Sequence, residues 1–189
     1  MGEKKEYKSS LRSKRWIKEA FTELLKQKEY NKITVTDIVT LADINRATFY
    51  KHYPDVRGLM ESIENDICAE MFHILEEFDY NTFFSNPTAV LRQLIDFLKS
   101  GREFYSILLM SDGSKAFLDK TKLLFEQYMQ ANDKVPEKVR TSSSYRIRIN
   151  FFAGGIVNLL SEWITGQLDC TQEDILDQLR FLLKGGGLS

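Results

Sequence analysis

The chain has 189 residues, of which 43% are hydrophobic, and its formal net charge is −1. This composition excludes a disordered or collagen-like chain, and the sequence holds no run of about 18 uninterrupted apolar residues that could span a bilayer. Two cysteines are too few for a disulfide framework, so we expect a protein of the reducing cytoplasm.

The charge is divided unevenly along the chain. Residues 1–57 carry 13 Lys and Arg against 8 Asp and Glu, a net charge of +5, whereas residues 58–189 carry a net charge of −6. A basic end on an acidic body predicts a polyanionic partner for that end alone. The alternative is a solvated helix face that is rich in charge and binds no partner.

The first predicted elements are four helices. The apolar period around Phe21 predicts a helix from about Ser10 to Lys28. Thr34 and Asp37 form a capping box before a short second helix that starts at Val35, and Asn45 caps a third helix over residues 46–52. Pro54 ends that helix. Asp55 then caps a fourth helix, whose apolar stripe consists of Met60, Ile63, Ile67, Met71, Ile74 and Phe78.

Turn signals divide the rest of the chain into further helices. They predict helices over residues 87–99, 102–110, 115–130, 144–165 and 171–184. The last of these opens with a second capping box, Thr171 to Asp174. No convincing strand is present, so helices joined by short loops predict an all-α bundle.

Residues 35–42 and 46–52 have the proportions of a helix-turn-helix. Their shared apolar residues are Ile38, Ala42, Ile44 and Phe49. The surface of the second helix would carry groups that suit a major groove: Arg46 and Lys51 for base edges or phosphates, Asn45 and Thr48 for either, Ala47 for a thymine methyl, and Tyr50 and His52 for phosphates.

The segment from Ile33 to Tyr53, followed by Leu59, resembles the N-terminal DNA-binding signature of TetR/AcrR-type transcriptional regulators. The resemblance covers about residues 10 to 60. It combines the capping box, a small residue in the turn, and a Thr-aromatic-Tyr-x-His-aromatic run. Two positions depart from the family pattern: Asp43 stands where the turn usually has Gly, and Val56 stands where Lys is common, with Arg57 as the substitute phosphate contact.

The resemblance implies an all-helical homodimer. Its N-terminal three-helix helix-turn-helix domain, residues 1–54, would bind a palindromic operator in double-stranded DNA, and residues 55–189 would form a helical-bundle domain for effector binding and dimerisation. The implied DNA-binding residues are Thr34, Thr36, Asn45, Arg46, Ala47, Thr48, Tyr50, Lys51, His52 and Arg57.

The family role implied is a repressor that a small-molecule effector releases from DNA. The alternative is an activator or coactivator of the same family that acts through a protein partner. No group of residues combines a nucleophile, a base and an orienting residue, so no enzymatic activity is expected. The sequence likewise predicts no cofactor and no metal site.

Two further sets of residues are predicted in the larger domain. Aromatic side chains that could line an effector pocket are Phe72, Phe97, Tyr105, Phe125, Tyr128, Tyr145 and Phe151, with ordinary core packing as the alternative. Apolar stripes that could form a four-helix dimer interface contain Phe152, Ile156, Leu159, Leu160, Trp163, Ile175, Leu179 and Leu182, with internal core as the alternative. Gly154 and Gly155, inside one of these helices, predict a close backbone approach.

Overall fold

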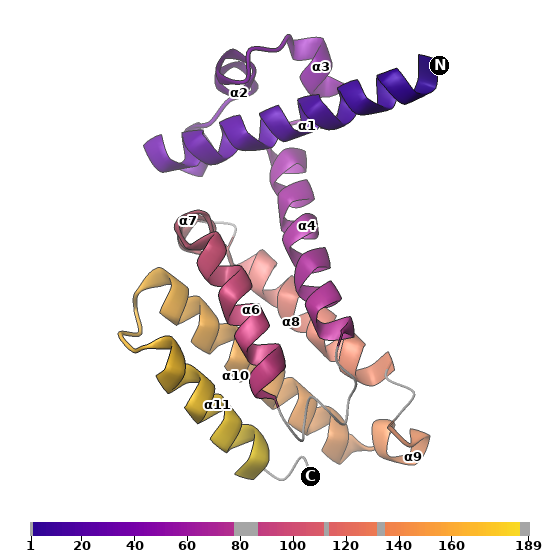
Figure 1. The fold of residues 1–189 in the computed structure, drawn as a ribbon, viewed down its shortest axis with the longest axis vertical. Coiled ribbons are helices and arrows are strands. Elements are labelled where there is room, and N and C mark those ends of the chain that lie inside the picture. The colour runs from indigo at the N-terminus through magenta and orange to yellow at the C-terminus, as the bar shows by residue number, and fades with distance from the viewer. Residues whose placement is uncertain (1, 78–86, 112–113, 132–134, 186–189) are drawn as a thin grey trace. The chain divides into compact units, whose positions relative to one another are not determined.

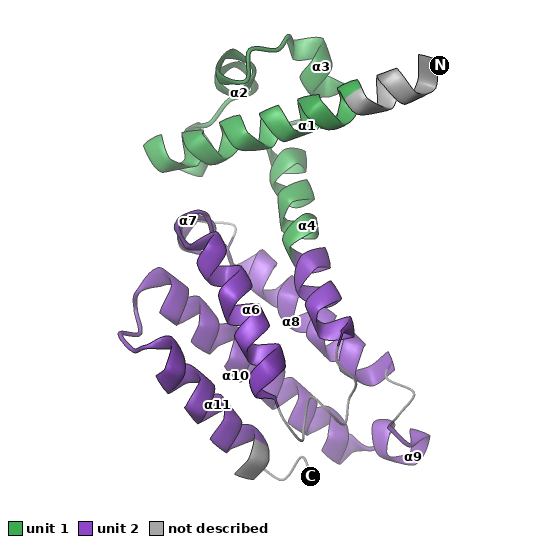
Figure 2. Cartoon of the chain, in the orientation of Figure 1, with its two compact units in different colours: residues 1–67 green, residues 68–189 purple. Residues whose placement is uncertain are grey.

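The computed structural model describes residues 2–77, 87–111, 114–131 and 135–185. Within these ranges the regular elements are helices and no strand occurs (Figure 1). The predicted all-α fold, with an N-terminal helix-turn-helix and a helical domain after it, is confirmed. None of the described helices is long and apolar enough to cross a membrane. The chain divides into two compact units, residues 1–67 and 68–189 (Figure 2).

The first unit is built around a helix-turn-helix. Its elements are α1 (Gly2–Gln27), a single 3-10 turn η1 (Tyr30–Lys32), α2 (Val35–Leu41), α3 (Arg46–Tyr50) and the first part of α4 (Val56–Glu76). Helix α1 packs on α2, and α2 packs on α3. The fully buried side chains that form the core of this unit are Ile17, Phe21, Ile38, Phe49 and Leu59.

The predicted caps are present. The Thr34–Asp37 capping box is complete, and Asn45 caps α3 through the amide of Thr48. Asp55 accepts a 2.7 Å bond from the amide of Gly58 at the start of α4. At the start of α11 (Gln172–Gly185), the amide and hydroxyl of Thr171 donate to Asp174 over 2.9 and 2.6 Å. These side-chain bonds satisfy amides that have no partner inside the helix.

Helix α1 starts earlier than predicted, at Gly2 instead of about Ser10. Ser9 and Ser10 therefore lie inside the helix, and their carbonyls accept bonds from the Ser13 hydroxyl. Glu and Lys are good helix formers, and residues 3–6 consist of these two types, so the helix continues past the serines. The sequence also missed two single turns, η1 and α9 (Glu137–Arg140), because such short elements leave no periodic signal.

The second unit has α10 at its centre. It contains the rest of α4 together with α6 (Thr88–Ser100), α7 (Arg102–Met110), α8 (Ser114–Ala131), α9, α10 (Ser143–Thr165) and α11 (Gln172–Gly185). Helix α10 contacts α6, α7, α8 and α9, and α11 packs on α6. The Arg92 guanidinium binds Glu173 across the α6–α11 contact at 3.0 Å.

Among the described residues, no backbone of the same chain approaches Gly154 or Gly155 closely, so the predicted close approach stays a prediction for an interface between two copies. A methyl group added at Gly154 would meet only the side chain of Lys122, at 3.8 Å, and one added at Gly155 would meet nothing within 4 Å. Gly166 has a real conformational reason to be glycine, because it ends α10 at φ 79° in the left-handed region. The predicted stripe of α4 ends at Phe78, which lies outside the described residues.

Candidate nucleic-acid interface

The turn between α2 and α3 is set by one residue with positive φ. Asp43 has φ 52°, so it adopts the left-handed conformation for which this turn more commonly uses glycine. The amide of Ile44 then donates to the carbonyl of Val39 over 3.0 Å, which closes the turn. Asp therefore forms the tight turn that a helix-turn-helix requires.

Asn45 and Thr48 bind each other at the start of α3. The side-chain oxygen of Asn45 accepts a 2.8 Å bond from the Thr48 amide and a 2.9 Å bond from the Thr48 hydroxyl. This oxygen therefore caps the helix, and the predicted contact of these residues with DNA would add to a structural role.

Thr34 and Asp37 are committed to the start of α2. The Thr34 hydroxyl donates to the Asp37 carboxylate over 2.7 Å and accepts a 3.2 Å bond from the Asp37 amide. The Lys28 ammonium also binds this carboxylate, at 2.7 Å. These bonds favour the charged form, with Lys28 the largest cause, and they lower the pKa of Asp37 to about 2.

Arg46 and Thr36 are joined across the helix-turn-helix. Arg46 is the first residue of α3, and Thr36 is the second residue of α2. The Arg46 Nη2 donates to the Thr36 Oγ1 over 2.5 Å, and both side chains are exposed.

The outer face of α3 carries the other predicted contacts. Tyr50 is 54% exposed although it is aromatic, and Ala47 and Lys51 are exposed as well. Phe49, between them, is fully buried and anchors the helix in the core of the unit. Helix α3 therefore has one buried face, and its other face is open to solvent.

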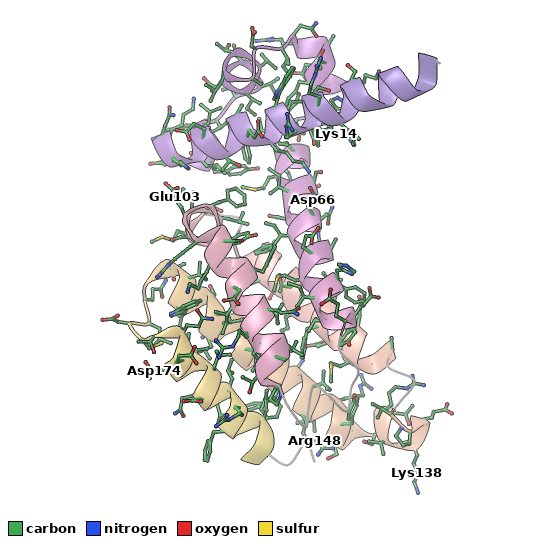
Figure 3. The ribbon with its side chains drawn as sticks, in the orientation of Figure 1. Lys14, Asp66, Glu103, Lys138, Arg148 and Asp174 are labelled. Atoms are coloured by element: carbon green, nitrogen blue, oxygen red, sulfur yellow. The ribbon has the colours of Figure 1, made fainter. Side chains whose placement is uncertain are left out.

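His52 contacts α1. Its Nε2 lies 2.7 Å from the Ser13 hydroxyl, which in turn donates to carbonyls of its own helix. Which of the two groups donates this bond depends on the tautomer of the imidazole. Burial lowers the pKa of His52, and the nearby Lys14 on α1 (Figure 3) and Lys51 lower it further.

Arg57, the substitute predicted for the lysine that Val56 replaces, pairs with Glu61. The two side chains meet at 2.9 Å one turn apart on α4, and both are largely exposed. A phosphate contact by Arg57 would have to compete with this ion pair, so the predicted role stays a prediction.

Six of the seven aromatic residues predicted to line a pocket are buried or half-buried: Phe72, Phe97, Tyr105, Phe125, Tyr128 and Tyr145. The hydroxyls of Tyr128 and Tyr145 donate to the carbonyls of Leu75 and Met129, at 2.7 and 3.1 Å. Burial, with a smaller contribution from Glu70, raises the pKa of Tyr105 to about 12. Phe151 differs from the predicted interior position: it is 72% exposed and lines an open groove of α8 and α10.

The residues predicted for the dimer interface are likewise mostly buried or half-buried, with one that is exposed. Five are buried within their own chain: Ile156, Leu160, Trp163, Ile175 and Leu179. Phe152 and Leu159 are half-buried, and Leu182 is 51% exposed. The same two helices also carry two more exposed apolar side chains that are not in the predicted set, Ile147 and Phe181. Both are apolar residues that lie outside the buried stripe of their helix, and the helical period of the sequence could have identified them on that basis.

No group of three or more potential metal-ligating side chains occurs among the residues described. His73, the second histidine, is exposed on α4.

Residues 85–185, more than half of the chain, match a TetR-type family described as "Transcriptional regulator C-terminal region". The uncharacterised HTH-type transcriptional regulator YxbF of Bacillus subtilis (strain 168) is 33% identical over 78 residues, which are 41% of this chain and 19% of YxbF.

A second relative is DhaS of Lactococcus lactis subsp. lactis (strain IL1403), an HTH-type transcriptional activator of the dhaKLM operon. It is 30% identical over 105 residues, which are 56% of this chain and 53% of DhaS. The matched part of the chain therefore spans about a fifth of YxbF and about half of DhaS.

Solved structures share the fold over almost the whole chain. A TetR-family regulator structure from Syntrophomonas wolfei has a TM-score of 0.72 at 16% identity and covers 94% of this chain and 96% of its own. A structure of a dihydroxyacetone kinase operon activator DhaS has a TM-score of 0.66 at 22% identity, covering 92% and 95%. A TetR regulator from Streptococcus agalactiae 2603V has a TM-score of 0.65 at 23% identity, covering 94% and 97%.

Proposed function

We propose, from the premise that the chain belongs to the TetR family of transcriptional regulators, that it binds a palindromic operator as a homodimer and represses transcription until a small-molecule effector releases it. The family is one of transcriptional regulators and not of enzymes. The observation that carries the proposal is the exposed face of α3, on which Arg46, Ala47 and Tyr50 are solvent-exposed, with Lys51 exposed directly after the helix.

The distribution of charge supports DNA as that partner. The first 57 residues carry a net charge of +5, and phosphate contacts supply much of the affinity of DNA-binding proteins. The acidic remainder of the chain would repel DNA, so contact would be confined to the helix-turn-helix.

Exposed apolar side chains on the last two long helices support a dimer. Ile147 and Phe151 are exposed on α10, and Phe181 and Leu182 are exposed on α11. A stable interface needs such side chains at its centre. The proposed interface thus keeps Leu182 from the predicted set and replaces the buried stripe residues by their exposed neighbours.

The effector would bind in the second unit, where the aromatic side chains gather. Helix α4 has residues in both compact units, so a change at its second-unit end could be transmitted to the helix-turn-helix. Allosteric coupling of this kind is typically worth about 1–3 kcal/mol.

Selection of bound sequences from random double-stranded DNA tests the proposal. The protein should enrich one sequence with two-fold symmetry, whose half-sites are centred about 34 Å apart or a multiple of that spacing. Enrichment of no sequence, with and without cell extract as a source of effector, would contradict operator binding.

A second candidate function is transcriptional activation through a protein partner. The similarity to DhaS, whose name describes an activator, favours it. Deletion of the gene separates the two candidates, because transcripts next to the selected operator rise if the protein is a repressor and fall if it is an activator.

A further inference from the structure

The bond between Arg46 and Thr36 places a guanidinium at the start of the recognition helix. The Nη2 of Arg46, at the first position of α3, donates to the hydroxyl of Thr36 on α2 over 2.5 Å. An exposed arginine ordinarily samples many rotamers. Here Thr36 on α2, the first helix of the helix-turn-helix, holds the far end of the Arg46 side chain in one place.

The charge of Arg46 is retained in this arrangement. Thr36 is a neutral partner, so the bond orients the guanidinium without cancelling its charge. The other arginines of the first unit are held differently, because Arg15 pairs with Glu19 at 3.6 Å, Arg57 pairs with Glu61 at 2.9 Å, and Arg12 lies over the Trp16 ring of its own helix at 4.9 Å. Of these four arginines, Arg46 is the one that is oriented by a hydrogen bond to an uncharged side chain of another helix.

Donors remain after the bond to Thr36. A guanidinium has five N–H groups, so Nη2 keeps a second N–H and Nη1 keeps two. Two N–H groups that point the same way match two neighbouring acceptors. In the major groove, guanine presents such a pair, its O6 and N7 atoms, and arginine bonded to both is the commonest specific contact.

We infer that Arg46 reads a guanine in each operator half-site and that Thr36 is the positioning residue for this contact. The inference rests on the proposed function. The N-terminal residues of a recognition helix contact base edges when the helix lies in the major groove, which favours a base over a phosphate as the target of Arg46. Ala47 is exposed beside it and adds only a methyl group, so no bulky side chain at the next position hinders close approach.

The first experiment replaces single guanines of the selected operator by 7-deazaguanine, which lacks the N7 acceptor. One guanine in each half-site should be the partner of Arg46. Replacement of that guanine should weaken binding of the unaltered protein about 5- to 150-fold. The same replacement should leave the affinity of the Arg46→Ala variant unchanged, because that variant has already lost the donor.

The second experiment tests Thr36 with a matched pair of variants. Thr36→Val keeps the shape of the side chain and removes the hydroxyl, whereas Thr36→Ser keeps the hydroxyl. Thr36→Val should reduce the preference for guanine over adenine at the Arg46 position, while the salt dependence of binding stays the same. Thr36→Ser should keep most of that preference.

Lys51→Ala serves as the comparison for a phosphate contact. It should weaken binding about equally for all sequences and reduce the slope of affinity against salt by about one ion. If Arg46→Ala behaves in this way, Arg46 contacts a phosphate and the inference is overturned.

The experiments give different results depending on whether operator binding or only the guanine contact is absent. If the protein enriches no sequence at all, operator binding itself fails. If it binds a selected operator tightly but no 7-deazaguanine position distinguishes it from Arg46→Ala, only the guanine contact fails. Equal guanine preference in Thr36→Val and the unaltered protein would overturn the role of Thr36.

Discussion

At the residue scale, His52 joins the end of α3 to α1. Its Nε2 lies 2.7 Å from the Ser13 hydroxyl. The sequence placed His52 on the recognition helix and predicted a phosphate contact, but it gave no sign of Ser13, which is 39 residues away. Contacts such as this one and Arg46–Thr36 join different helices, so the periodicity within a single helix does not predict them.

The environment of His52 predicts a pH effect on stability. The folded protein lowers the pKa of His52 through burial and two lysines, whereas the unfolded chain has the ordinary value near 6.5. The unfolded state therefore binds more protons in the range just below pH 6.5, and the folded state loses stability as the pH falls through that range. Urea unfolding at pH 7.5 and 5.5 should show a larger loss of stability for the unaltered protein than for His52→Asn.

NMR titration of the imidazole provides an independent check of that prediction. A His52 pKa at or above 6.5, or equal losses of stability in the two proteins, would contradict it.

At the scale of elements, the helix starts were predictable where a side-chain cap marks them. Thr34, Asn45, Asp55 and Thr171 all cap the helices that the sequence assigned to them. The start of α1 was not predictable from Ser9 and Ser10, because a serine caps a helix only if the chain before it leaves the helical conformation. Here the preceding backbone is already helical.

The capping box of α2 should contribute measurably to stability. Thr34→Ala removes the hydroxyl that accepts from the Asp37 amide, and loss of such a cap costs about 0.5–2 kcal/mol of unfolding free energy. Thr40→Ala is the matched control, because Thr40 is exposed on the same helix and alanine favours helix. In urea unfolding, Thr34→Ala should be less stable than the unaltered protein and Thr40→Ala should be more stable. Equal stabilities of the two variants would contradict a stabilising role of the cap.

Substitution of a glycine on α10 tests whether another surface lies against that helix. Because a methyl group at Gly155 meets nothing within its own chain, Gly155→Ala should raise the unfolding free energy of an isolated chain by about 1 kcal/mol. Gly166→Ala is the opposite case, because its φ of 79° is strained for alanine, and it should destabilise. Thermal unfolding distinguishes them; destabilisation by Gly155→Ala would show that another surface lies against this glycine.

At the scale of the whole molecule, the unequal charge, the all-α fold and the helix-turn-helix were all predictable from the sequence. The sequence did not predict as well which faces of α10 and α11 are buried and which are exposed. The stripe containing Ile156 and Leu160 is apolar enough for either an interface or a core, and only the packing of α10 against its neighbours assigns these two residues to the core.

If the protein is a dimer through α10 and α11, a variant that lacks exposed aromatic groups on these helices should have a lower average mass in solution. Replacing both Phe151 and Phe181 by serine removes two exposed aromatic groups, each of which would contribute about 1.5–3 kcal/mol on burial, so dissociation should increase at least tenfold. Sedimentation equilibrium should show this shift towards monomer. Met110→Ser, an exposed apolar position on α7, is the control and should leave the mass unchanged.

The central claim is that the exposed face of α3 binds operator DNA. Its most direct test is the affinity of the selected operator for the unaltered protein and for the double variant Tyr50→Ala/Lys51→Ala, measured by fluorescence anisotropy over a series of salt concentrations. Both side chains are exposed, so the variant should keep its helical circular dichroism spectrum. The affinity of the unaltered protein should fall steeply with salt, and the variant should bind more weakly with a shallower slope. An unchanged affinity in the folded double variant would contradict the central claim.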